Sequence, residues 1–181
     1  MFPVFLDVKK LRILLIGQGE AARRRLKQLR NFGAENIIFY DKLISTEKML
    51  EANIVMVVGL EADEANRIAE MARGMGKLVN VEDDISNCDF YYASTLQRGD
   101  LTIAVGTNGT SPTLARTVTA FLSGVFGERW GEWVDRLGEA RRDWRAEGAD
   151  GQTVASRTEA MIIEEEMQPL SDFLKSSQGQ E

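Results

Sequence analysis

A short apolar strand that runs into a glycine turn constrains the fold of this chain more than any other feature. Leu11 to Ile16 carry mostly aliphatic side chains, and the sequence Gly17-Gln-Gly-Glu-Ala-Ala22 follows directly. An apolar run of this length that stops at glycine is typical of a buried parallel strand. Over residues 20–32 apolar side chains recur every three or four positions, which predicts a helix that ends at Gly33.

The alternation of strand and helix continues along the chain. The expected order is strand 36–40, helix 45–51, strand 54–58, helix 61–75 and strand 77–81. Strands that alternate with helices form a parallel sheet, so the fold class is α/β with a Rossmann-like sheet. Further strands are expected at 90–93 and 101–105, and a helix at 113–125.

From Gly127 onward the pattern indicates helices alone. An amphipathic helix is expected to begin near Trp130, and a break falls at 146–151. A last helix is expected over 154–167, and residues 176–181 are typical of a frayed tail.

The glycine turn has the residue types that the pyrophosphate of a dinucleotide requires. Gly17 allows a tight turn, Gly19 lets the backbone approach the ligand, and Ala22 permits close packing of helix on strand. Glu20 and Ala21 complete the first helical turn, whose amide groups face the negative charge. The motif follows a strand and opens a helix, which is the context that supports cofactor binding. A plain α/β turn without a nucleotide is the alternative.

Asp41 closes the second strand and indicates which dinucleotide is bound. An acidic side chain here can accept hydrogen bonds from ribose hydroxyls and would repel a ribose phosphate. NAD is therefore the expected cofactor rather than NADP, although Lys42 beside Asp41 reduces that preference. Both residues are assigned to cofactor binding.

An acidic cluster, Asn80-Val-Glu-Asp83-Asp84, follows the expected strand 77–81. Ligands of open α/β sheets bind at the carboxyl ends of the strands. Asp83 is therefore expected to face the nicotinamide region. The alternative is an acidic loop that only contacts solvent.

A polar loop precedes the expected helix 113–125. It offers backbone amides and polar side chains from five successive residues, Thr107, Asn108, Gly109, Thr110 and Ser111. Such groups beside a helix start can bind carboxylates or phosphates, so the loop is assigned to substrate binding. They can equally cap the helix, with Thr110 or Ser111 as N-cap and Pro112 as the first helical residue.

Composition narrows the classes of function. The formal net charge of −6 argues against broad nucleic-acid binding, which needs a basic surface. The chain has no histidine, so a zinc site is not expected and no metal ligands are assigned. The single Cys88 excludes an internal disulfide. Neither a membrane span nor a signal peptide is expected, which points to the cytoplasm.

Four segments together resemble the precorrin-2 dehydrogenase family, which includes the N-terminal module of bifunctional siroheme synthases. Phe2-Pro-Val-Phe-Leu6 resembles the family's start, and Leu15-Ile-Gly-Gln-Gly-Glu-Ala-Ala22 resembles its nucleotide turn. Asn80-Val-Glu-Asp83 resembles the segment that holds the family's catalytic aspartate, which falls on Asp83. Gly109-Thr-Ser-Pro-Thr-Leu-Ala-Arg116 resembles its most distinctive stretch. The similar segments lie within residues 2–122.

The resemblance implies an activity in siroheme biosynthesis. Precorrin-2 would give a hydride to NAD+ and a proton to Asp83, yielding sirohydrochlorin. Some relatives also insert ferrous iron, and Asp83 could serve that step too. The family position that can carry a phosphoserine falls on Thr107. The resemblance also implies a homodimer, with an NAD-binding domain over 1–92, a dimerisation region over 93–126 and a helical C-terminal region over 127–181.

The chain departs from the family between Asp41 and Asn53, where relatives have a further helix and strand. After Val58, Gly-Leu-Glu-Ala replaces the family's acidic, threonine-containing turn. These changes support an alternative, a catalytically silent NAD- or tetrapyrrole-binding sensor or carrier of the same fold. A regulatory NAD-binding module of ion transport is a further alternative, but the segment 109–112 has no role in a bare nucleotide module.

Overall fold

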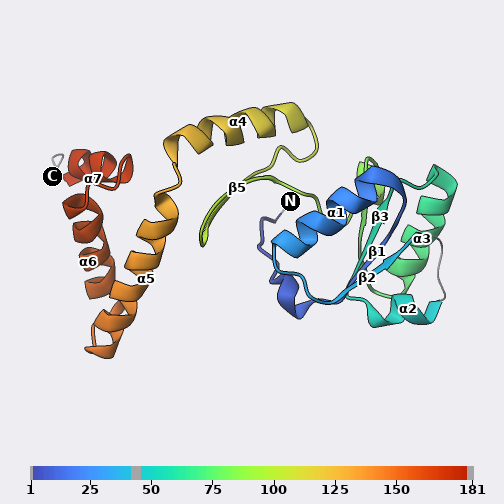
Figure 1. Cartoon of the computed structure of the whole chain (residues 1–181), viewed down its shortest axis with the longest axis horizontal. Helices are drawn as coiled ribbons and strands as arrows, with labels where there is room; N and C mark the ends of the chain where they lie inside the picture. Colours follow the sequence, from blue (N-terminus) through green and yellow to red (C-terminus); the bar gives the residue numbers. More distant parts are fainter. Residues whose placement is uncertain (1, 42–45, 179–181) are drawn as a thin grey trace. The chain divides into compact units, whose positions relative to one another are not determined.

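The structure is a computed structural model that describes residues 2–41 and 46–178. The chain divides into two compact units, Met1–Tyr92 and Ala93–Glu181 (Figure 1). The assignment of 93–126 to a dimerisation region and of 127–181 to a helical region stays a prediction.

The first unit contains a parallel sheet of four strands in the order β2-β1-β3-β4. The strands are β1 Ile13–Gly17, β2 Ile37–Tyr40, β3 Ile54–Val58 and β4 Leu78–Val81. Every residue of β1 and β3 is buried, because these central strands are covered on both faces. The sequence expectation of an α/β fold with a Rossmann-like sheet is confirmed.

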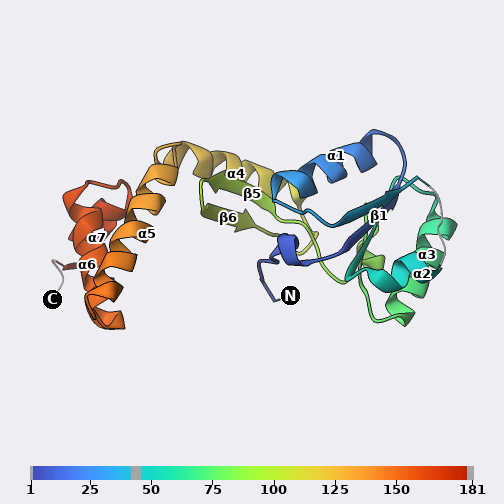
Figure 2. The same ribbon diagram turned by 60° about the horizontal axis from the view of Figure 1, so that its bottom comes forward.

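Helices cover both faces of this sheet (Figure 2). On one face, α1 (Gly19–Asn31) packs Ala22 and Leu29 against alternate residues of β1 and β3. On the other face lie α2 (Thr46–Glu51) and α3 (Ala62–Gly74). Two short 3-10 turns, Val8–Lys10 and Ile85–Asn87, complete the unit.

The connection from β2 to β3 is short, as the sequence predicts. Its only helix in the described part of the chain is α2, which has six residues. Within the described residues, β2 pairs with β1 alone and therefore forms the edge of the sheet. The segment 42–45 lies outside the described residues.

The second unit begins with an antiparallel hairpin of β5 (Ser94–Arg98) and β6 (Leu101–Val105). Four helices follow, α4 (Pro112–Val125), α5 (Trp130–Ala146), α6 (Gly151–Glu164) and α7 (Leu170–Gln178). Trp130, Trp133 and Met167 form the buried centre of the helical part. The break at 146–151 separates α5 from α6, as expected.

Three sequence expectations for irregular segments were wrong. Residues 90–93 are not a strand, because Phe90 packs against the α1 side of the sheet and its carbonyl accepts a hydrogen bond from Asn80. The helix expected over 154–167 is α6, which spans Gly151–Glu164. It begins earlier than expected because the Asp150 side chain caps it by accepting a hydrogen bond from the Thr153 amide. The tail from residue 176 continues α7 as far as Gln178. None of the helices in the described residues is long and apolar enough to cross a membrane.

Candidate functional site at the carboxyl edge of the sheet

The register of the sheet aligns the predicted cofactor residues along one edge. Gly17 pairs with Val58, Ile16 pairs with Tyr40, and Val57 pairs with Val81. The segments after the four strands therefore leave the sheet at the same edge. Because β1 and β4 are two strands apart, about 10 Å separates the glycine turn from the end of β4.

Gly17 is required by a close approach of two backbones. A Cβ atom at this position would lie 2.2 Å from the carbonyl oxygen of Val58. The Gln18 amide donates to that same oxygen at 3.1 Å. A Cβ on Gly59 would lie 2.8 Å from the carbonyl oxygen of Gln18. The turn after β1 is thus packed directly against the turn after β3.

Gly19 has a different role. Its backbone has a positive φ, which favours glycine, and the space beside its Cα is open. Its φ is +71°, and a Cβ built there would meet nothing within 4 Å among the described residues. Gln18, the N-cap of α1, makes no side-chain cap hydrogen bond in this part of the structure. Open space beside uncapped amides at a helix start fits a pyrophosphate. Glu20 is exposed, Ala21 half-buried and Ala22 buried.

Asp41 lies beside this turn. It follows β2 directly, is exposed, and its carbonyl accepts a hydrogen bond from Gln18 Nε2 at 2.8 Å. The Gln18 side chain, which lies between Gly17 and Gly19 in the sequence, therefore joins the end of β2 to the glycine turn. Lys42, also assigned to cofactor binding, lies outside the described residues.

Asp83 occupies a strained position in a tight turn. The Glu82 amide donates to the Val57 carbonyl, and the Asp84 amide donates to the Val81 carbonyl, at 2.9 and 3.2 Å. Asp83 has φ +65° and is exposed. Asp83 is the third residue of the turn 81–84, and its positive φ favours glycine. A non-glycine residue held in this region stores strain, which is common at functional sites.

The acidic side chains near Asp83 in the sequence make hydrogen bonds and an ion pair that stabilise the loop. Hydrogen bonds from Ser86 and then Asn87 lower the pKa of the Asp84 carboxyl. The Asp89 carboxylate accepts from the Val79 amide at 2.9 Å and pairs with Arg73 at 3.1 Å. Asp83 is therefore an exposed acid of this loop, and unlike Asp84 and Asp89 its side chain has no hydrogen bond or ion pair among the described residues.

Cys88 also belongs to this bracing. Its sulfur lies 3.3 Å from the Val81 nitrogen and 3.1 Å from the Val81 carbonyl oxygen. Burial raises the pKa of the Cys88 thiol, so it stays protonated near neutral pH. These contacts and the raised pKa indicate a packing residue rather than a nucleophile.

Arg25 is a residue whose role sequence reasoning missed. It lies among the arginines of α1, but its side chain is only 13% exposed and pairs with Glu82 at 3.2 Å. Its guanidinium also lies over the Tyr92 ring, 3.7 Å from the centroid. No local signal could have revealed this, because Arg25 and Glu82 are 57 residues apart.

The predicted substrate loop belongs to the second unit and is a well-formed helix cap. Ser111 is the N-cap of α4, with its hydroxyl accepting from the Leu114 amide, and Pro112 is the first helical residue. Thr107 Oγ1 accepts from the Ser111 amide at 3.1 Å. The capping alternative is therefore confirmed.

Substrate binding by the loop stays a prediction. Asn108 and Gly109 have positive φ, and the side chains of Asn108 and Thr110 are exposed. These two side chains are the ones that the cap leaves available.

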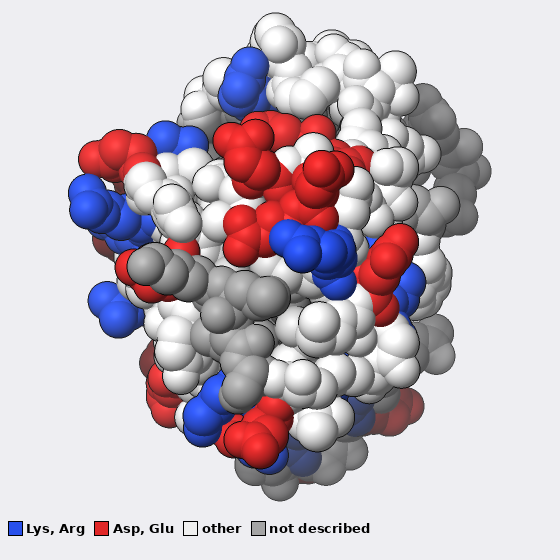
Figure 3. Space-filling view, turned by 90° about the vertical axis from the view of Figure 1, so that its right-hand side faces the viewer, with Lys and Arg blue, Asp and Glu red and all other residues white. Residues whose placement is uncertain are grey.

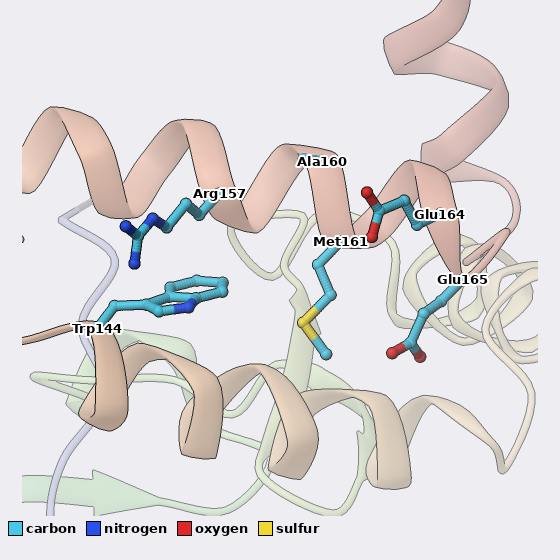
Figure 4. A pocket seen from close by; sticks show the side chains of 6 residues that line it. All are labelled: Trp144, Arg157, Ala160, Met161, Glu164 and Glu165. Carbon is cyan, nitrogen blue, oxygen red and sulfur yellow. The ribbon is translucent and has the colours of Figure 1, made fainter.

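A separate cavity of about 420 Å³ lies between α5 and α6 (Figure 4). It is lined by residues that the sequence analysis did not single out as a site, Trp144, Arg157, Ala160, Met161, Glu164 and Glu165. The Arg157 guanidinium lies 5.9 Å from the centroid of the Trp144 ring and pairs with Glu147 at 3.0 Å. This cation–π contact joins the two helices.

The surface charge of the first unit and the placement of possible metal ligands bear on two other kinds of function. Figure 3 shows acidic side chains gathered on one face of the first unit, which would repel the phosphates of a nucleic acid. Within residues 2–41 and 46–178, no group of three or more acidic or cysteine side chains is arranged to hold a metal ion.

The first half of the chain matches a known protein family. Residues 4–94 match the family described as "Putative NAD(P)-binding". The chain belongs to this NAD(P)-binding family. The match covers the parallel sheet, the glycine turn and the Asp83 loop, so cofactor binding is assigned at the level of NAD(P).

Relatives and a solved structure confirm the resemblance to siroheme synthases and precorrin-2 dehydrogenases. The chain is 29% identical over 208 residues to a siroheme synthase from Actinobacillus succinogenes, covering 95% of this chain and 44% of that protein. It is 28% identical over 212 residues to siroheme synthase 1 from Serratia proteamaculans, covering 98% and 44%. The chain thus spans less than half the length of these curated relatives.

The solved structure of SirC, precorrin-2 dehydrogenase, has the same fold. It aligns with a TM-score of 0.71 at 21% identity and covers 90% of this chain and 89% of its own. The alignment with the Actinobacillus protein is longer than this 181-residue chain, so the relative carries insertions. Such insertions are consistent with a shortened segment in this chain.

Proposed function

We propose that this chain binds NAD+ at the glycine turn and oxidises precorrin-2 to sirohydrochlorin. The observation that carries the proposal is the alignment of three features along one edge of the sheet. These are an open glycine turn at a helix start, an acid at the end of β2, and an exposed, strained aspartate after β4. The similarity to siroheme synthases and to SirC supports the choice of substrate.

The chain's own residues would hold the cofactor in two places. Amides of the first turn of α1 donate to the pyrophosphate across the space that Gly19 leaves open. The Asp41 carboxylate accepts hydrogen bonds from the ribose hydroxyls. The hydrogen bond from Gln18 to the Asp41 carbonyl holds these two parts together.

Asp83 would act as the general base. Bound NAD+ supplies hydride acceptance, so the protein must orient the tetrapyrrole and remove one proton. An exposed carboxylate on a braced turn can approach a substrate that enters from solvent. Substrate binding by the loop 107–111 of the second unit is a separate part of the proposal, for which the exposed side chains of Asn108 and Thr110 offer hydrogen-bond donors. A homodimer and iron insertion by the same aspartate are further parts of the proposal.

Turnover of purified protein tests the proposal. Precorrin-2 and NAD+ are mixed with the protein, and sirohydrochlorin is followed by its absorbance; ferrous iron is added in a second reaction to detect siroheme. We expect sirohydrochlorin to form in proportion to protein concentration. Binding of NAD+ and of precorrin-2 without any turnover would refute the dehydrogenase.

The silent sensor or carrier is the second candidate, and one observation favours it. The connection between β2 and β3 is short, and β2 is the edge of the sheet in the described residues, so no further strand of this sheet supports that side of the nucleotide site there. Binding without turnover is the result that this candidate predicts.

Asp41 gives a prediction about cofactor choice. Replacing it by serine removes the acid that would repel a ribose phosphate, so we expect the ratio of NADP+ to NAD+ affinity to rise about tenfold, or about 1.4 kcal/mol. Calorimetric titration with both dinucleotides measures this ratio. Glu47→Gln, on exposed α2, is the matched control and should leave it unchanged. An unaltered ratio for the Asp41 variant would show that the acid does not face the ribose.

A further inference from the structure

We propose that Arg25 is a positioning residue that holds the Asp83 turn against α1, the helix that starts at the glycine turn. The inference rests on the proposed function, because it concerns the placement of the base assigned there. It adds a residue that lies outside every motif found in the sequence. Three contacts of one guanidinium, with Glu82, Gln28 and Tyr92, carry it.

Arg25 contacts both ends of the loop that contains Asp83. Its Nη2 lies 3.2 Å from Glu82 Oε1, one residue before Asp83. Its guanidinium lies 3.7 Å from the ring centroid of Tyr92, where the loop ends. Tyr92 in turn donates its hydroxyl to Met56 Sδ of β3 at 3.3 Å. A single side chain of α1 therefore connects the start and the end of the loop.

The contacts use properties that only arginine combines. The planar guanidinium pairs with Glu82 through Nη2, donates to Gln28 Oε1 through Nη1 at 2.5 Å, and stacks on Tyr92. The Glu82 side chain is 22% exposed, so both partners of the ion pair are largely shielded from solvent. This shielding distinguishes the Arg25–Glu82 pair from mobile ion pairs on the surface, which contribute little to the free energy of unfolding.

Stability alone does not account for this arrangement. Arg25 Nε is buried and has no hydrogen-bond partner in the described residues. A buried donor without a partner costs free energy, and a shielded ion pair is often no more stabilising than apolar side chains of similar volume. Orientation of the loop is the property that these contacts supply.

The Asp83 carboxylate depends on that orientation. In the described part of the chain its side chain makes no hydrogen bond that would hold it, so the backbone of the turn sets its direction. Displacing a catalytic group by about 1 Å can lower the rate about 100-fold. If the loop lost its contacts with α1, the protein would therefore stay folded while its catalytic rate would fall.

The test uses the double variant Arg25→Met/Glu82→Gln, which removes both charges together. Arg25→Met alone would leave the Glu82 carboxylate shielded and unpaired, which destabilises the fold. We expect the double variant to keep its thermal midpoint, to lose at least tenfold in kcat, and to keep KM for NAD+ within twofold. Arg30→Met, an exposed arginine of the same helix, is the control and should keep its full kcat.

Amide hydrogen exchange gives a readout that needs neither substrate nor cofactor. The Glu82 and Asp84 amides should exchange at least tenfold faster in the double variant, while those of β1 keep their rates. Unchanged exchange at Glu82 and Asp84, or a kcat within twofold of the parent, would overturn the role of Arg25. If the parent protein shows no turnover, the proposed function fails, and the exchange rates still decide the positioning role.

Discussion

Asp83→Asn is expected to abolish sirohydrochlorin formation while the protein stays folded. The amide cannot take a proton, and general-base catalysis contributes about 10²–10⁴ to a rate. The side chain makes no hydrogen bond in the described residues that the change would break, so folding should be unaffected. The initial rate of sirohydrochlorin formation with NAD+ measures the loss, and circular dichroism checks the fold.

A second variant at this position separates catalysis from stability. Asp83→Gly relieves the strain of φ +65°, worth about 1–2 kcal/mol, against an entropic cost of glycine of about 0.5–1 kcal/mol. The free energy of unfolding should therefore rise by up to about 1.5 kcal/mol while turnover is lost. Asp63→Asn, on an exposed part of α3, is the control for activity. Retention of more than a tenth of the rate by Asp83→Asn would remove Asp83 as the base.

Gly17→Ala is expected to lower the free energy of unfolding by about 3 kcal/mol or more. The new Cβ would lie 2.2 Å from the Val58 carbonyl oxygen, which also accepts the Gln18 amide. Since β1 and β3 are the central strands of the sheet, neither backbone can move without losing ladder hydrogen bonds on its other side. Overpacking that cannot relax gives effects of this size. Urea denaturation followed by circular dichroism measures it.

Two other glycines serve as controls for Gly17. Gly74, the last residue of α3, has open space within the described structure and no positive φ, so Gly74→Ala should be neutral or stabilise by up to about 1 kcal/mol. Gly19→Ala should cost about 1–2 kcal/mol through its φ of +71° and should also weaken NAD+ binding, since its Cβ would enter the open space. Equal stability of the Gly17 and Gly74 variants would contradict the close packing of β1 on β3.

Much of the first unit could be predicted because its signals are local. The apolar run of β1, the glycine turn and the periodicity of α1 lie within a few residues of one another, and each favours one local structure. The Ser111 cap and the proline after it were likewise readable in sequence. The start of β5 was missed, because residues 90–92 have strand-like composition but Phe90 and Tyr92 contact α1 and the sheet.

By itself the sequence determined the order of strands and helices, the glycine turn and the acids that follow the strands. Only the tertiary structure decided the strand register that aligns Gly17, Asp41 and Asp83, the positive φ of Asp83, and the contact of Arg25 with Glu82 across 57 residues. The physical reason is that helix and strand preferences act between neighbours in the chain. The register of the sheet and the packing of α1 on it bring together residues whose separation no local pattern records.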